Sequence, residues 1–132
     1  MTDQPPALRS WHTIAATRDP ALLDELLADD VEFRSPAVFA PMTGKAVTTL
    51  ALTGALRVLG PSLHYVAEWY DGGSAVLEFE AVLDGVYLQG VDILRWNSDD
   101  KLTSFTVMAR PLRGLEKLID LMSRELGSGP RP

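Results

Sequence analysis

The sequence contains no cysteine, which excludes disulfides, thiolate zinc sites, cysteine nucleophiles and iron–sulfur clusters. It holds two histidines, far apart in the chain, so we expect no metal site and no cofactor. No apolar run approaches the ~20 residues that span a bilayer, and residues 1–6 lack the basic and apolar regions of a signal peptide. We therefore expect a cytoplasmic protein that does not engage a membrane.

The sequence also contains fewer basic than acidic side chains. Twelve Lys and Arg stand against eighteen Asp and Glu, giving a net charge of −6, whereas nucleic-acid binders normally present a clustered basic face. We expect no nucleic-acid partner. A chain of 132 residues has room for one core, so we expect a single domain over residues 1–132. Its core covers about 7–111, a further helix 112–126, and a tail 127–132.

The first third of the chain predicts two helices and a strand. Leu8, Trp11 and Ile14 recur at helical spacing. Asp19 and Pro20 are a typical helix start, and the leucine stripe that follows predicts a second helix ending near residues 29–30. Period-two alternation predicts a strand over 31–35. Residues 36–43 are expected to form a loop, and 44–59 a helix ended by a Gly-Pro pair.

The rest of the chain predicts an antiparallel meander followed by a helix. Strands are expected over about 63–70, 74–83, 86–97 and 101–110, because the short links between them suit hairpins and leave no room for crossover helices. Helical spacing returns over 112–126. Helices segregated from an antiparallel sheet define the α+β class. A twisted sheet that curls around the middle helix would leave a pocket at its open end.

Asp92 is the most informative residue for function. Strict alternation along residues 86–96 places it on an otherwise apolar face of the strand. A carboxyl group there loses hydration, so its pKa rises, and it can donate a hydrogen bond or act as a general acid. Two structural alternatives stay open: pairing with an arginine such as Arg95 or Arg110, or a bulge at Gly90 that turns Asp92 outward.

The chain resembles the SnoaL-like and ketosteroid-isomerase-like branch of the nuclear-transport-factor-like superfamily over about residues 8–111. The resemblance is carried by RDPALLDELLADDVEF at 18–33, TGKAV at 43–47 and GVDILRW at 90–96. It implies a cystatin-like, cone-shaped curved sheet wrapped around the N-terminal and middle helices, here with an extra C-terminal helix. It does not imply one activity, because this fold hosts isomerases, dehydratases, cyclases, epoxide hydrolases and non-catalytic binders.

The resemblance also assigns positions in a site. Asp92 falls where the isomerases keep the protonated aspartate of their oxyanion hole, a system that serves as a standard example of pKa tuning. Trp11 falls where they place a partner tyrosine, and Ser35 where they carry the aspartate that shuttles the proton. An indole N–H can donate a hydrogen bond but cannot transfer a proton, and a lone serine is no base near neutral pH. Isomerisation by the mechanism of that family is therefore doubtful.

Other residues complete the candidate site. His64 is a third catalytic candidate beside Asp92 and Ser35, because dehydratases of the superfamily use pocket histidines, although its strand face can point either way. Glu78 and Glu80 are expected on the outer, solvated or intersubunit face. The expected pocket lining is Trp11, Phe33, Phe39, Tyr65, Leu94, Phe105 and Met108.

The sequence therefore predicts a protein that binds a small hydrophobic ligand bearing a carbonyl or phenol group. Isomerase, dehydratase or polyketide cyclase chemistry with Asp92 as acid or base is one hypothesis, and a non-catalytic binding or interaction module is the alternative. Catalysis requires a second polar group beside Asp92, such as Ser35, Tyr65 or His64. We expect a homodimer through the outer sheet face, with the C-terminal helix acting as a lid on the pocket or as a dimer element.

Overall fold

The computed structural model describes residues 4–126, and the tail expected at 127–132 lies outside them. Its helices are α1 (Pro6–Thr17), α2 (Pro20–Leu26), α3 (Lys45–Leu59) and α4 (Leu112–Leu126). Its strands are β1 (Leu27–Arg34), β2 (Met42–Thr43), β3 (His64–Asp71), β4 (Ser74–Leu83), β5 (Val86–Trp96) and β6 (Leu102–Arg110). The predicted meander and the predicted C-terminal helix are confirmed to within one or two residues.

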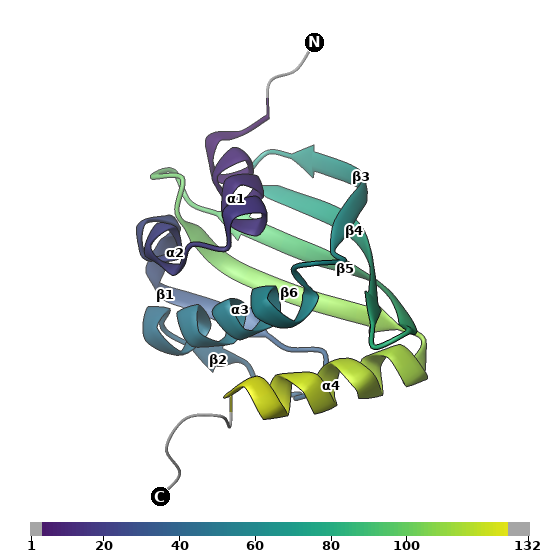
Figure 1. The fold of residues 1–132 in the computed structure, drawn as a ribbon. Helices are drawn as coiled ribbons and strands as arrows, with labels where there is room; N and C mark the ends of the chain where they lie inside the picture. Colours follow the sequence, from purple (N-terminus) through teal and green to yellow (C-terminus); the bar gives the residue numbers. More distant parts are fainter. Residues whose placement is uncertain (1–3, 127–132) are drawn as a thin grey trace, which may run out of the picture.

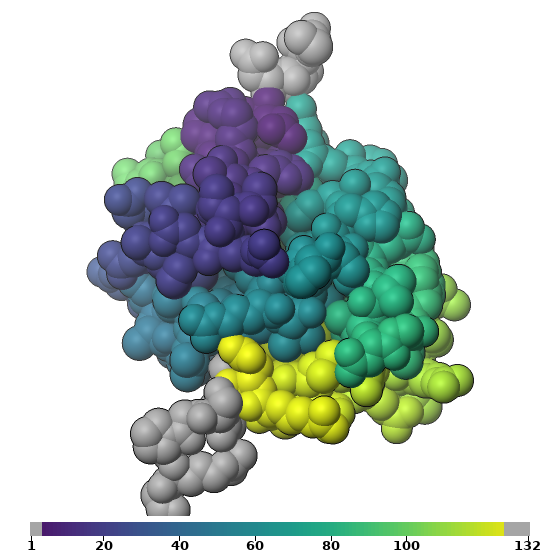
Figure 2. Space-filling view, in the orientation of Figure 1, coloured from purple at the N-terminus to yellow at the C-terminus, as the bar shows by residue number. Residues whose placement is uncertain are grey.

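The strands form one curved, open sheet in the order β2-β1-β6-β5-β4-β3. Figure 1 shows α1, α2 and α3 on one side of this sheet, with α4 running beside α3 across its open end. In the space-filling view, the yellow surface of α4 lies directly against the teal surface of α3 (Figure 2). The predicted α+β class and its helix-filled curved sheet are confirmed. None of the helices described in residues 4–126 is long and apolar enough to cross a membrane.

The N-terminal part of the sheet corrects two expectations. β1 runs parallel to β6, so the sheet is mixed rather than antiparallel. β1 also begins at Leu27, four residues earlier than expected, because Leu27 pairs with Leu102 and is buried there. The leucine stripe assigned to the second helix therefore continues into the strand. Two residues of the expected loop, Met42 and Thr43, pair with β1 as the short strand β2.

Strand register determines which side chains face the helices. Leu77 on β4, Asp92 on β5 and Val107 on β6 are direct cross-strand partners. Directly opposed residues point to the same face of a sheet, so these three side chains form one row. The neighbouring residues Val91 and Met108 form the corresponding row on the outer face. Asp92 therefore lies at the centre of the inner face.

The hydrophobic core joins the helices to the inner face. Trp11 of α1 packs edge-on against Phe105 of β6, with ring centroids 4.7 Å apart, and the Phe33 ring of β1 lies 6.1 Å from that of Phe105. These three side chains are buried, as are Leu52 and Leu56 of α3. Edge-to-face packing of this kind fixes ring orientation as well as burying apolar area. The core therefore holds α1 in place against β6.

Gly90 provides a test of inner-face packing. An added Cβ atom would fall on the Met108 carbonyl oxygen and lie 2.6 Å from Cζ of Phe79. We expect Gly90→Ala to lower the free energy of unfolding by roughly 1–3 kcal/mol, since overpacking forces the backbone or the ring to move. Urea denaturation measures the change. Arg95→Ala, at an exposed position on the same strand, is the matched control, and its free energy of unfolding should stay within about 0.5 kcal/mol of the parent. Equal stability of the two variants would contradict the tight packing at Gly90.

Candidate functional site

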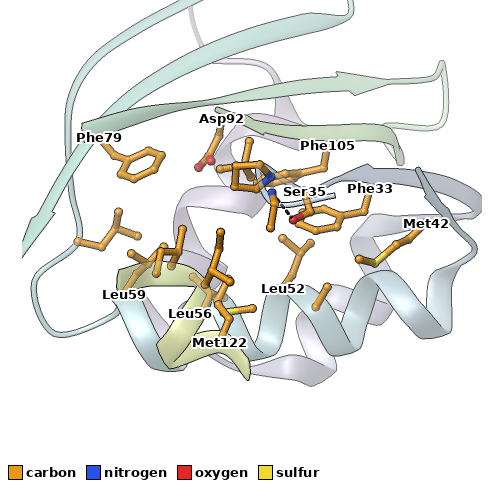
Figure 3. Close-up of a pocket in the computed structure, with 18 of the residues that line it drawn as sticks. Phe33, Ser35, Met42, Leu52, Leu56, Leu59, Phe79, Asp92, Phe105 and Met122 are labelled. Atoms are coloured by element: carbon orange, nitrogen blue, oxygen red, sulfur yellow. Dashed lines mark hydrogen bonds between the residues drawn. The ribbon is translucent and has the colours of Figure 1, made fainter. Parts of the chain in front are cut away.

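A cavity of about 280 Å³ lies between the inner face of the sheet and helices α3 and α4. Asp92, Phe79 and Phe105 project into it from the sheet, opposite Leu52, Leu56 and Leu59 of α3 and Met122 of α4 (Figure 3). The polar or ionisable side chains in its lining are Ser35, Tyr65, Asp92 and Ser123, with the indole of Trp11. The cavity is therefore an apolar pocket with few polar groups, the usual form of a small-molecule site.

Asp92 is buried in the wall of this pocket and is 6% exposed. The Tyr65 hydroxyl donates a hydrogen bond to its Oδ2 atom at 2.6 Å. Burial raises the pKa of the Asp92 carboxyl to about 7, and the hydrogen bond from Tyr65 opposes part of that rise, because it stabilises the charged form. Asp92 is therefore able to hold or release a proton near neutral pH.

Tyr65 reaches Asp92 from the edge strand β3. Its own oxygen accepts a hydrogen bond from the Trp11 indole N–H at 2.9 Å. Burial, followed by the neighbouring Asp92 charge, raises the pKa of the Tyr65 hydroxyl well above its usual range, so this group remains a neutral donor. The three side chains form a chain of hydrogen bonds from α1 through β3 to β5.

An irregularity in β3 brings a second set of polar groups to the same side. The register with β4 shifts between Tyr65 and Ala67, so that Glu68 faces the helices as Tyr65 does. The Glu68 carboxylate contacts Nε2 of His12 at 2.6 Å and accepts a hydrogen bond from Gln4. The His12 ring packs perpendicular to the Tyr65 ring, 5.5 Å between centroids. Polar contacts from the N-terminal segment therefore hold Glu68, and the His12 ring packs against Tyr65.

Six of the ten residues predicted for the site line the pocket. They are Trp11, Phe33, Ser35, Tyr65, Asp92 and Phe105. The alternatives for Asp92 do not occur: the pairing of β4 with β5 is regular through Gly90, and Arg110 hydrogen-bonds Gln89 on the outer face. The Ser35 hydroxyl accepts a hydrogen bond from the Ala37 amide, which shapes the loop after β1. Tyr65, not Ser35 or His64, is the polar group in contact with Asp92.

Four predicted site residues lie outside the pocket lining. The His64 side chain points to the outer face, where Nε2 lies 3.4 Å from Glu80, because the shift in β3 separates it from Glu68. Met108 is 55% exposed on the outer face, since it pairs with Val91. Phe39 is fully exposed in the proline-rich loop. Leu94 has the expected inward orientation but is buried in the core beyond the pocket. Glu78 and Glu80 lie on the outer face as predicted and hydrogen-bond Gln89 and Tyr87.

The walls contributed by α3 and α4 are a part of the pocket for which no residues were predicted. Leu52, Leu56 and Leu59 line it from α3, and their four- and three-residue spacing was the available signal. Four residues of α4 also line it: Leu118, Ile119, Met122 and Ser123. Gly114 lets the start of α4 approach β5 closely, because a Cβ atom there would meet the Tyr87 carbonyl oxygen. In residues 4–126 no three acidic or histidine side chains gather into a group that suits a metal ion.

Comparisons with known proteins agree with this architecture. A steroid delta-isomerase from Pseudomonas aeruginosa superposes with a TM-score of 0.88 and 37% sequence identity over 92% of this chain and 90% of the other. An uncharacterised cystatin-like protein from Silicibacter pomeroyi gives 0.83 and 26% over 89% and 83%. A candidate polyketide cyclase from Sinorhizobium meliloti shares the fold at 0.66 and 14% over 80% and 96%. No family model and no curated protein sequence matches the chain.

The curved mixed sheet, filled by helices and open at one end, is the nuclear-transport-factor-like fold. With 37% identity to the steroid delta-isomerase over nearly the whole length of both chains, this protein belongs to the ketosteroid-isomerase-like branch of that superfamily. The resemblance in its sequence is thereby confirmed. Its activity is a separate question, because one fold of this kind carries many functions.

The raised pKa of Asp92 predicts a defined pH dependence of stability. Between pH 3.8, where the unfolded carboxyl titrates, and about 7, the folded state holds a proton that the unfolded state has lost. The free energy of unfolding contributed by Asp92 therefore falls as pH rises through this window, by roughly 4 kcal/mol at the upper limit, and is constant above it. We expect Asp92→Asn to remove this fall.

Urea denaturation of parent and variant at half-unit steps from pH 4 to 8 measures the difference, which cancels the titration of the remaining carboxyls. The variant should gain stability relative to the parent as pH rises to about 7. A difference that is independent of pH would show that Asp92 titrates normally in the folded protein.

Proposed function

We propose that this protein binds a small hydrophobic ligand through a carbonyl or phenol oxygen, and that Asp92 exchanges a proton with it, as in an isomerase, dehydratase or cyclase. The observation that carries the proposal is a carboxyl group with a pKa near 7 in the wall of an otherwise apolar cavity, in contact with a neutral tyrosine. A group of that pKa is suited to both taking and giving a proton at neutral pH.

One carboxyl is sufficient for a proton shift within a ligand. The Asp92 carboxylate removes a proton from the carbon beside a carbonyl, leaving an enolate, and the resulting carboxylic acid returns the proton to another carbon of the same conjugated system. The number of atoms and charges is unchanged, and no cofactor is required. The apolar walls exclude water, which keeps the proton held by Asp92 from being lost to solvent between the two transfers.

A non-catalytic binding module is the second candidate, and the residue at position 35 supports it. Ser35 stands where the isomerases of the family carry their proton-shuttling aspartate, and its hydroxyl is engaged with the Ala37 amide. The pocket would then use Asp92 as a hydrogen-bond donor to the ligand. Both candidates need the same ligand chemistry and differ in whether bonds to hydrogen are broken.

A pair of probes tests the ligand chemistry. A carbonyl oxygen can only accept a hydrogen bond, so a bicyclic α,β-unsaturated ketone requires the protonated form of Asp92. We expect its affinity to fall about tenfold per pH unit above 7 and to be level below. Asp92→Asn, whose amide still donates, should bind with no such pH dependence, and Asp92→Leu should bind far more weakly. Titration calorimetry measures both.

Naphthalene and 2-naphthol, which differ by one hydroxyl, are the matched ligand control. Stronger binding of 2-naphthol that disappears in Asp92→Leu supports oxygen recognition by Asp92, and equal binding of the two would overturn it. Turnover is then assayed with the β,γ-unsaturated isomer of the same ketone, by the ultraviolet absorbance of the conjugated product. Binding with no turnover above the Asp92→Asn level selects the non-catalytic candidate.

We also propose that α4 is a lid and that two copies pair through the outer sheet face. The lid is supported by the four α4 side chains in the pocket wall. Pairing is supported by apolar side chains exposed on the outer face, including Val66, Trp69, Val82 and Met108. The two roles belong to different surfaces.

Paired variants separate these roles. Ile119→Ala with Met122→Ala should raise the off-rate of 2-naphthol several-fold and leave the sedimentation velocity of the protein unchanged. Trp69→Glu should convert a dimer to a monomer and leave the off-rate unchanged. The converse pattern, in which the α4 variant dissociates the dimer without affecting the off-rate, would assign α4 to the interface.

A further inference from the structure

The hydrogen-bond chain from Trp11 through Tyr65 to Asp92 has a direction. The Trp11 indole N–H donates to the Tyr65 oxygen at 2.9 Å, and the Tyr65 hydroxyl donates to Oδ2 of Asp92 at 2.6 Å. Trp11 is 2% exposed and its ring is held edge-on against Phe105. The donor at the head of the chain is therefore fixed in place by packing.

The chemistry of an indole prevents this chain from reversing. An indole N–H donates and has no lone pair available to accept, whereas a phenol does both. If a protonated Asp92 donated from Oδ2 to Tyr65, the tyrosine proton would need a different acceptor. Trp11 cannot be one, and within residues 4–126 the group that accepts from this hydroxyl is Asp92. The reversed arrangement leaves a buried hydroxyl proton without a partner, which is costly.

We infer that Trp11 is a positioning residue: by fixing the direction of the chain, it keeps Oδ2 of Asp92 occupied by the Tyr65 proton, so that the proton Asp92 gains and loses resides on Oδ1. This inference rests on the proposed function, since it specifies which oxygen exchanges a proton with the ligand. The hydrogen-bond chain also cannot relay a proton away from Asp92, because a relay through Tyr65 would require Trp11 to accept a proton. Asp92 then exchanges protons through the pocket alone.

The groups packed around the chain leave its direction unchanged. Two titratable side chains, His12 on α1 and Glu68 on β3, lie beside Tyr65 and contact each other. The His12 ring packs perpendicular to the Tyr65 ring, and its Nε2 atom is engaged by Glu68. The neighbouring strands present Leu77, Phe79 and Val107. From α3 and α4 the pocket wall is apolar apart from Ser123.

Neutron diffraction of the deuterium-exchanged full chain tests the inference without any ligand. At pD 5 we expect deuterium on Oδ1 of Asp92 and the Tyr65 deuterium directed at Oδ2. At pD 9 the Oδ1 deuterium should be absent and the Tyr65 deuterium unchanged. Deuterium on Oδ2 directed at Tyr65 at pD 5 would overturn the inference. Because no ligand is present, this result stands apart from success or failure of the ligand-binding experiments.

The titration midpoint of Asp92, followed by NMR at its carboxyl carbon, is a second test. A residue with a merely structural role would not change this midpoint. Tyr65→Phe keeps the ring and removes the donor, so the midpoint should rise by about one pH unit. Trp11→Phe should raise it by less, because a tyrosine that no longer receives a hydrogen bond donates more weakly. Trp69→Phe, an exposed tryptophan on the outer face, should leave it unchanged.

Trp11→Tyr separates direction from packing. A phenol at position 11 can accept as well as donate, so at pD 5 part of the Asp92 deuterium should appear on Oδ2. If Trp11→Phe leaves the Asp92 midpoint equal to that of Trp69→Phe, or if Trp11→Tyr leaves all of the deuterium on Oδ1, Trp11 does not set the direction of the chain.

Discussion

A single buried hydrogen bond, from the Tyr65 hydroxyl to the Asp92 carboxyl, is the interaction on which the organisation of the pocket depends. It joins the edge strand β3 to the central strand β5 across β4. The register shift in β3 places Tyr65 for this contact, and Trp11 completes it from above the sheet. Strand register and helix packing are therefore linked through one polar contact in an apolar interior.

The same contact sets the chemistry of Asp92 by opposing its burial. Desolvation alone would raise the pKa of the carboxyl further, and a salt bridge to an arginine would lower it. A neutral donor lies between these extremes, since it stabilises the charged form without cancelling the charge. The resulting pKa of about 7 is what a group needs if it is to act as both acid and base. Tyr65 can play this part because its own pKa is raised, so it donates without giving up its proton.

The sequence predicted most of this fold because the meander is locally encoded. Alternation along β5 was sufficient to place Asp92 inward, and the hairpin links located four strands. What it could not show depends on contacts distant in sequence, namely the parallel pairing of β1 with β6 and the register shift in β3. That shift explains why the face of His64 was ambiguous. Phe105 and Met108 are three residues apart on one strand, so their side chains point to opposite faces and both could not have faced the pocket. The alternation along this strand was therefore sufficient to exclude Met108.

Ser35 and Trp11 together bear on the role proposed for Asp92. If the pocket is catalytic, as proposed, the serine at position 35 leaves Asp92 as the acid–base group, and a proton taken from a ligand would be held on Asp92 and returned from it. Storage requires that the proton not be lost through the wall of the pocket, and a donor-only indole behind Tyr65 meets that requirement. A tyrosine at position 11 would open a reversible path, whereas tryptophan leaves the pocket as the route of exchange. The two departures from the family pattern are therefore consistent with one another. Ser35 leaves the pocket without a second base, and Trp11 confines the proton to Asp92.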